Sequence, residues 1–119
     1  MRVALHTRLA PGHEARYDVD HARIPDDLAE AMARAGISEW HIWRSGRDVF
    51  HLVECDDLEA ARASLATEPA EHAWQQHIGP HVVPVVLDDG SVAPLVAPHV
   101  WSLSDQHQPE TTTPQEGTS

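Results

Sequence analysis

The sequence has no lysine, no asparagine, a single cysteine and no long apolar run. All 8 basic residues are arginine, against 19 acidic residues, so the formal net charge is −11. A strongly acidic chain without a basic run lacks the surface that binds nucleic-acid phosphates or anionic lipids, so we expect neither nucleic acid nor a membrane as a partner. No stretch reaches the roughly 20 apolar residues that a membrane-spanning helix needs. The residues after Met1 turn polar too early for a signal peptide.

The one cysteine, Cys55, excludes a disulfide within the chain and a thiol-based metal cluster. A chain with one thiol fits a reducing compartment, so we expect a cytoplasmic protein. Cys55 has no activating neighbour in the sequence, and we interpret it as a small buried hydrophobe. The chain has 119 residues, of which 41% are hydrophobic, which suffices for one domain with a modest core and not for two.

The hydrophobic pattern predicts elements in the order β-α-β-β-α-β. Alternation with a period of two predicts three strands, at residues 3–9, 37–44 and 49–55. Helical spacing predicts helices at residues 13–35, with a break at Pro25, at about 57–66, and at 69–78. Two weaker strands are expected, an edge strand at 82–87, which contains Pro84, and a last strand at 96–103.

This order of elements is that of an α+β, ferredoxin-like fold, βαββαβ, in which an antiparallel sheet carries its helices on one face. The other face of such a sheet must also be buried, and the common solution is a second copy packed face to face. We therefore expect a homodimer of the dimeric α/β barrel kind. Residues 1–103 form the expected domain. Residues 104–119 are polar or acidic, without a large apolar side chain, and form an expected disordered tail.

Two pairs of aromatic residues are candidates for a site. Tyr17 and His21 are four residues apart on the first predicted helix, so both project from one face and form an acid–base or sugar-orienting pair. The alternative is that Tyr17 packs at the edge of the core and His21 is solvated. Trp40 and Trp74 come from different elements, and an indole offers a flat platform for a sugar and an N–H that orients a hydroxyl. The alternative for each is plain core packing.

Two charged residues are weaker candidates for binding substrate. Glu54 lies near the end of the third strand, where a carboxylate on the buried side of the sheet would orient His21 or a hydroxyl. A solvated charge at a strand end is the alternative. Arg8, on the first strand, is a candidate to neutralise Glu54 or to bind a hydroxyl.

Three histidines within and just after the last helix, His72, His77 and His81, raise the question of a metal. Zinc needs three or four converging ligands. Gly79 and Pro80 break the helix between the last two histidines, so one helical face cannot carry all three. We therefore expect no metal site.

Several motifs together resemble the L-rhamnose mutarotase family. The resemblance covers about residues 2–80, with a fainter echo at Asp89-Gly90-Ser91 and Val100-Trp101-Ser102-Leu103. It is carried by Thr7-Arg8-Leu9-Ala10-Pro11-Gly12, Glu14, Tyr17, His21, Ile24, Leu28, Ala35-Gly36-Ile37-Ser38-Glu39-Trp40, Val49-Phe50-His51-Leu52-Val53-Glu54, Ala66-Thr67 and Trp74. The resemblance implies a ferredoxin-like fold, a homodimer, no cofactor, and interconversion of the α and β anomers of L-rhamnose.

The same resemblance implies roles for single residues. His21 matches the family's catalytic histidine, a proton donor, and Tyr17 matches its sugar-binding tyrosine. Trp40 stands where the family usually has a tyrosine that contacts the sugar. Trp74 keeps the second of two adjacent tryptophans, whereas Ala73 replaces the first.

A further departure from the family is Pro25-Asp26-Asp27, which stands where the family has Trp-Pro-Glu.

Three hypotheses for the function follow. The leading one is an aldose mutarotase for L-rhamnose or a related 6-deoxy sugar, which needs only a group that gives and takes a proton near neutrality. The second is a cofactor-independent monooxygenase-like enzyme on the same dimeric barrel, because this scaffold hosts many chemistries. The third is a non-catalytic domain that binds a small sugar, which the lost tryptophans motivate.

Overall fold

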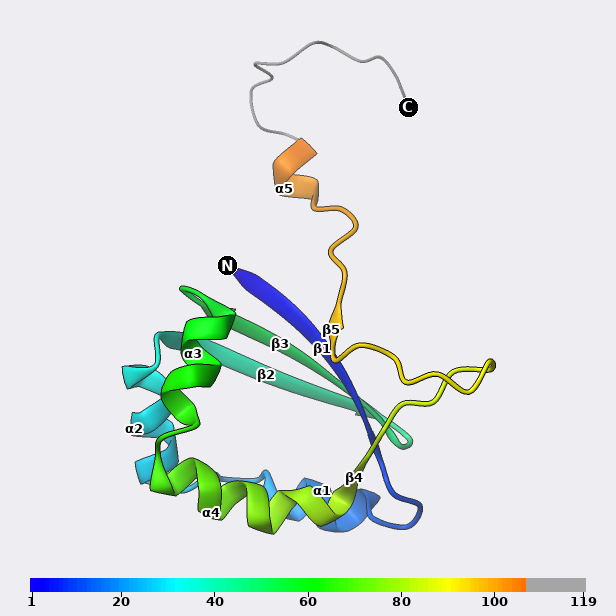
Figure 1. Cartoon of the computed structure of the whole chain (residues 1–119), viewed down its shortest axis with the longest axis horizontal. Coiled ribbons are helices and arrows are strands. Elements are labelled where there is room, and N and C mark those ends of the chain that lie inside the picture. The colour runs from blue at the N-terminus through cyan, green and yellow to red at the C-terminus, as the bar shows by residue number, and fades with distance from the viewer. Residues whose placement is uncertain (107–119) are drawn as a thin grey trace.

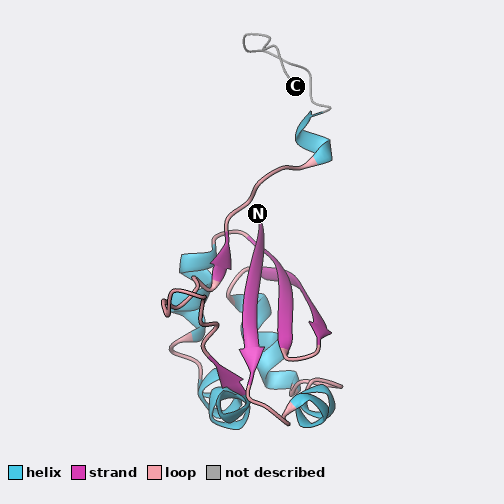
Figure 2. Ribbon diagram, turned by 90° about the vertical axis from the view of Figure 1, so that its right-hand side faces the viewer, coloured by secondary structure: helices cyan, strands magenta, loops and turns pink. Residues whose placement is uncertain are grey.

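A computed structural model describes residues 1–106, which form an antiparallel sheet with its main helices grouped along one side (Figures 1 and 2). The strands lie in the order β2-β3-β1-β4, and β5 also pairs with β1. This confirms the predicted α+β, ferredoxin-like arrangement. The elements are β1 (Arg2–Leu9), α1 (Glu14–Asp20), α2 (Asp26–Arg34), β2 (Ile37–Ser45), β3 (Asp48–Cys55), α3 (Leu58–Leu65), α4 (Pro69–Ile78), the 3₁₀ turn η1 (Gly79–His81), β4 (Val82–Val83), β5 (Val96–Ala97) and α5 (Leu103–Gln106).

Proline and glycine set the boundaries of the first two helices, as the sequence predicts. Pro25 separates α1 from α2 and stands at the N-cap of α2 with φ −59°. Asp26 and Asp27 occupy the first turn of α2, where carboxylates interact favourably with the helix dipole. Gly36 follows α2 with φ +88°, a conformation that ends helices and that side chains other than glycine rarely adopt.

A tight hairpin joins the two strands that are best matched to their predictions. Ser45 pairs with Asp48 across a two-residue turn. Gly46, the first central residue, has φ +59°, the sign that a type II′ hairpin turn requires. The hairpin sets the register in which Trp40 lies opposite Val53 and Ile42 opposite His51.

The strands present different side chains to their two faces. Buried apolar residues of β1 and β3 face the helices and form much of the core: Val3, Leu5, Leu9, Val49, Val53 and Cys55. Cys55 is 4% exposed, which confirms its predicted packing role. Leu28 and Ala31 from α2 are fully buried. The opposite face is open in the single chain, with Trp43 56% exposed and Phe50 43% exposed.

The two weak strands are shorter than predicted. β4 ends at Val83, because Pro84 has no N–H to continue the ladder, and Val86 instead forms an isolated bridge to Val92. β5 ends at Ala97, directly before Pro98, and so does not extend to residue 103. The short helix α5 includes residues 104–106, the first three of the predicted tail. The rest of the predicted tail, 107–119, lies outside the described residues.

Within residues 1–106, every helix is too short or too polar to cross a membrane.

Candidate functional site

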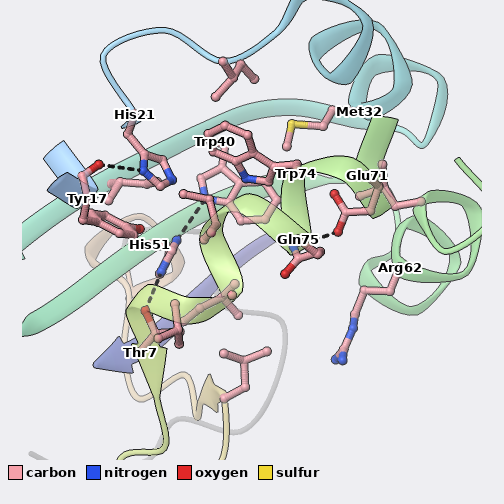
Figure 3. A pocket seen from close by; sticks show the side chains of 18 of the residues that line it. Thr7, Tyr17, His21, Met32, Trp40, His51, Arg62, Glu71, Trp74 and Gln75 are labelled. Carbon is pink, nitrogen blue, oxygen red and sulfur yellow. Dashed lines mark hydrogen bonds between the residues drawn. The ribbon is translucent and has the colours of Figure 1, made fainter. Parts of the chain in front are cut away.

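A cavity of about 1010 Å³ lies between the sheet and the helices (Figure 3). Its lining brings together Tyr17 from α1, His21 at the C-cap of α1, Trp40 from β2, His51 from β3 and Trp74 from α4. The apolar part of the lining includes Leu5, Ile24, Met32, Ile42, Leu58, Leu65 and Ile78. A concave, mostly apolar space with a few convergent polar groups is typical of a small-molecule site.

Tyr17 and His21 stack on each other at the end of α1. Their ring centroids are 4.1 Å apart and their planes are inclined by 29°. The ring of His21 also meets Trp74 edge to face, with centroids 5.1 Å apart. Tyr17 is 3% exposed and packs in a core cluster with Leu9, Val49 and Ile78. Tyr17 therefore both packs in the core and lines the cavity, so the two interpretations of it are compatible.

The hydrogen bond of His21 decides which of its nitrogens faces the cavity. Nδ1 lies 3.0 Å from the backbone oxygen of Tyr17. A carbonyl oxygen only accepts hydrogen bonds, so we assign the proton of the neutral ring to Nδ1 and a lone pair to Nε2. Burial lowers the pKa of His21 below its ordinary 6.5, and the bond to the Tyr17 carbonyl offsets part of this effect. At neutral pH His21 is therefore uncharged and able to accept a proton at Nε2.

Tyr17 has the opposite character. Burial, with a smaller contribution from the charge of Asp18, raises the pKa of Tyr17 to about 12. The phenol therefore stays protonated across the physiological range and serves as a hydrogen-bond donor. The cavity thus holds a proton acceptor and a proton-bearing hydroxyl on one turn of helix.

An ion pair fixes this helix on the sheet. Arg44 of β2 donates two hydrogen bonds to the Asp18 carboxylate, from Nε to Oδ1 at 2.8 Å and from a terminal nitrogen to Oδ2 at 2.6 Å. Hydrogen bonding to Arg44 lowers the pKa of Asp18. Bidentate arginine–carboxylate pairs define geometry as well as adding attraction. Asp18 immediately follows Tyr17, so this pair helps to position the catalytic candidates over the cavity.

His51 is a cavity residue that sequence reasoning did not single out. Its Nδ1 accepts a hydrogen bond from Nε1 of Trp40 at 3.1 Å, and its Nε2 lies 3.0 Å from Oγ1 of Thr7 (Figure 3). Burial, followed by the nearby His21 and His6, lowers the pKa of His51 to about 4. Alternation along the third strand places His51 with Val49 and Val53 on the core face. An imidazole on that face was the signal that could have found it.

The two tryptophans lie on the cavity, as predicted, but Trp40 offers less than expected. Its N–H is already donated to His51, so only the ring of Trp40 is left for a ligand. Trp40 also packs against the core cluster of Val3, Leu5 and Val53. Trp74 is partly buried against the cluster that contains Tyr17. Both rings therefore serve the core and the cavity at once.

Arg8 and Glu54 do not join this site. Arg8 donates from Nε to Oδ1 of Asp48 at 2.9 Å, and Oε2 of Glu54 lies 3.5 Å from Nε of Arg2. Side chains alternate along a strand, and the neighbours Leu9 and Val53 point to the helices, so Arg8 and Glu54 point to the open face. The sequence grouped Glu54 with Phe50 and Leu52 correctly, but the helices cover the other face.

Three other histidines, His13, His77 and His81, form a cluster around Asp20 of α1. His81 is 7% exposed and contacts Oδ2 of Asp20 through Nε2 at 2.9 Å, while Nε2 of His77 lies 3.2 Å from Oδ1. His13 reaches His81, Nδ1 to Nδ1, at 2.9 Å, a contact the sequence did not predict. Hydrogen bonding to His81, more than to His77, lowers the pKa of Asp20. Among residues 1–106, no group of three or more histidine, cysteine or acidic residues is arranged to hold a metal ion.

Comparison with known structures shows the same fold in two enzymes. An L-rhamnose mutarotase from Formosa agariphila superposes with a TM-score of 0.67, at 18% identity, over 87% of this chain and 98% of that one. The tetracenomycin F2 cyclase from Streptomyces glaucescens, a type II polyketide cyclase, superposes with a TM-score of 0.62, at 20% identity, over 86% of this chain and 95% of that one. None of the curated proteins compared with the chain matches it.

The family described as L-rhamnose mutarotase matches residues 2–103, which include every cavity residue discussed above. This match spans most of the chain, and the ferredoxin-like fold agrees with it. The chain therefore belongs to the L-rhamnose mutarotase family, whose members are isomerases acting on a sugar.

Proposed function

We propose that this chain exchanges the α and β anomers of L-rhamnose or a related 6-deoxy sugar, with His21 as the group that moves the proton. The observation that carries the proposal is the free Nε2 of a neutral His21 at the cavity, stacked on a protonated Tyr17. Acid–base exchange at one sugar carbon needs a proton acceptor and a hydrogen-bond donor within reach of the same oxygen atoms. The substrate-binding roles of Tyr17, Trp40 and Trp74 belong to this proposal.

The proposed steps conserve one proton. Nε2 of His21 takes the proton of the anomeric hydroxyl, the bond between C1 and the ring oxygen breaks, and the ring oxygen keeps the electron pair. The resulting imidazolium returns the proton to that oxygen, which gives the open-chain aldehyde. Rotation about C1–C2 and the reverse steps close the ring on the other face. The hydroxyl of Tyr17 stabilises the charged oxygen by donating a hydrogen bond. No electron or group is transferred, so the proposal requires no cofactor.

The decisive experiment is NMR saturation transfer between the two anomers of L-rhamnose. Positioned acid–base catalysis contributes about 10²–10⁴-fold, so we expect His21→Gln to lose about that factor in exchange rate. His72→Gln is the matched control, because His72 is an exposed histidine of α4 that bonds to the backbone of Ala66. Unchanged exchange in His21→Gln, with every 6-deoxy sugar tried, would remove His21 from the mechanism.

The pH dependence of the exchange rate gives a second test of the same site. The neutral form of His21 must accept the proton, and burial lowers its pKa below 6.5. The rate should therefore be constant at neutral and mildly alkaline pH and fall in the acidic range, as His21 becomes charged. A rate that falls as pH rises from 6 to 8 would mean that the resting histidine is protonated.

We also propose that the active form is a homodimer that buries the open face of the sheet. Trp43 stacks with His41, and Phe50 with His6, on this face. An exposed apolar surface of this kind on a sheet is typical of a protein interface. The cytoplasm remains the compartment we expect for this assembly.

One observation favours a second candidate function. The cavity of about 1010 Å³ stands at the upper end of the range for sites of drug-sized ligands, and its lining is largely apolar. Both features suit a substrate larger than a monosaccharide, such as a polyketide, the class of compound in the name of the type II polyketide cyclase from Streptomyces glaucescens. A thermal-shift comparison separates the candidates: stabilisation by polycyclic aromatic ketones and none by 6-deoxy sugars would favour the second.

The two other hypotheses have direct tests as well. A monooxygenase-like enzyme would consume oxygen in the presence of an aromatic substrate. A non-catalytic sugar-binding domain would be stabilised by L-rhamnose while leaving the rate of anomer exchange at its uncatalysed value.

A further inference from the structure

A chain of three polar side chains crosses the floor of the cavity, which is otherwise apolar. It runs from Thr7 on β1 through His51 on β3 to Trp40 on β2 (Figure 3). The register shows that this chain is diagonal, because Val49 lies opposite Thr7 and Val53 lies opposite Trp40, while His51 stands between them on β3. Diagonal neighbours on one face of a sheet are within reach of long and aromatic side chains.

The donors and acceptors of this chain leave one arrangement of hydrogens. The indole nitrogen of Trp40 only donates, so Nδ1 of His51 must carry the accepting lone pair. The proton of the neutral ring is then on Nε2, from which it is donated to the hydroxyl oxygen of Thr7. Both ring nitrogens of His51 are thereby occupied. His51 and His21 are thus opposite tautomers in one cavity, and only His21 keeps a nitrogen free.

We propose that His51 is a positioning residue, which holds the indole plane of Trp40 in the orientation that receives the sugar. Trp40 is partly buried, packs against the core cluster and also lines the cavity, so one part of its ring is left open to a ligand. The bond to His51 fixes the edge of the ring, and Thr7 fixes His51 in turn. His51 thereby acts on substrate binding through Trp40 and does not transfer a proton. This inference rests on the proposed function only in identifying the ligand of Trp40 as a sugar.

The test compares three variants by kinetics and by the NMR signal of the Trp40 indole N–H. His51→Leu removes both hydrogen bonds, and we expect about a 10-fold higher KM for the sugar, a smaller change in kcat, and about 10-fold faster exchange of the indole hydrogen with water. His51→Asn keeps an acceptor near the position of Nδ1 and should restore both values to within about 3-fold of the wild type. Thr7→Val keeps the bond to Trp40 and should have an intermediate effect.

The pH profile distinguishes positioning from catalysis. His51→Asn should keep the acidic limb of the exchange rate, because that limb belongs to His21. Loss of the limb in His51→Asn, or an unchanged KM and indole exchange in His51→Leu, would overturn the proposal. Circular dichroism and thermal unfolding identify variants that fail to fold, and if His51→Leu is one of them, Thr7→Val, which removes only the bond that holds His51, supplies the comparison of KM and indole exchange.

The failure of the proposed function can be told apart from the failure of this inference. The indole N–H signal is measured without substrate, so it reports the bond between Trp40 and His51 whatever the ligand is. Suppose that the wild-type chain exchanges no sugar, but that the indole hydrogen is protected in His51→Asn and not in His51→Leu. The positioning role of His51 would then stand, and the sugar would be rejected as the ligand.

Discussion

The two faces of the sheet have different surroundings, although the same strands supply the side chains of both by alternation. On the helix-covered face, Val49 and Val53 are fully buried, and His51 between them carries hydrogen bonds across three strands. On the open face, Phe50 is exposed, and the polar groups of β3 form ion pairs close to solvent. One strand thus supplies a cavity floor on one side and an exposed apolar surface on the other. Which face of the sheet becomes a binding site therefore depends on which face the helices cover, and not on the residue types alone.

The largest effect should come from placing a charge on the open face. Trp43→Glu is expected to weaken dimer formation by about 10³-fold or more, because association would bury an unpaired carboxylate. Sedimentation velocity measures the change. Val19→Glu is the control, because Val19 is 70% exposed on α1, away from the sheet. A dimer of unchanged stability in Trp43→Glu would show that the two copies meet through another surface.

His51, on the helix-covered face, should make the free energy of unfolding depend on pH. The pKa of His51 is about 4 in the folded chain, against 6.5 for a free histidine, so between these pH values the unfolded chain binds a proton that the folded chain does not. Stability is therefore complete above pH 6.5 and is lost as pH falls toward 4. The loss amounts to at most about 3 kcal/mol at ~1.4 kcal/mol per pH unit.

Urea unfolding at several pH values between 4 and 7 measures this loss, with His51→Asn as the comparison. The variant lacks the titrating group and should show a shallower fall in the free energy of unfolding than the wild type. Parallel pH dependences in the two proteins would contradict a neutral, buried His51.

The smallest effect is expected for the ion pairs of the open face. Glu54→Gln should change the free energy of unfolding by less than about 1 kcal/mol, because Arg2 is 72% exposed and surface ion pairs contribute little. Arg8→Met should behave similarly, and neither should alter the rate of anomer exchange per protomer.

By contrast, Tyr17→Phe, on the cavity, should slow exchange by about 10-fold or more through the loss of a hydrogen-bond donor. An equal loss of exchange rate in Tyr17→Phe and in Glu54→Gln or Arg8→Met would show that residues on both faces of the sheet contribute to the site.

Local pattern predicted the pair at the centre of the site but not its surroundings. Tyr17 and His21 share one helix face because four residues make about one turn, and no other part of the chain is needed for that inference. His51 required the register of three strands, and the contact of His13 with His81 joins residues 68 positions apart. Glu54 was grouped with the correct neighbours on its strand, but its pattern left open whether it faces the buried side of the sheet or solvent. Its alternation was readable, whereas the face that the helices would cover was not.

The sequence by itself determined the strands β1 to β3, the break at Pro25, the helical pair Tyr17 and His21, and a resemblance specific enough to name the family. These depend on periodicities of two and 3.6 residues and on local backbone restrictions, which act between near neighbours. Only the tertiary structure decided the length of β4 and β5, the covered face of the sheet, and the chain from Thr7 through His51 to Trp40. Those features depend on which distant segments pair, and on the hydrogen-bond donors and acceptors that pairing brings within about 3 Å of each other.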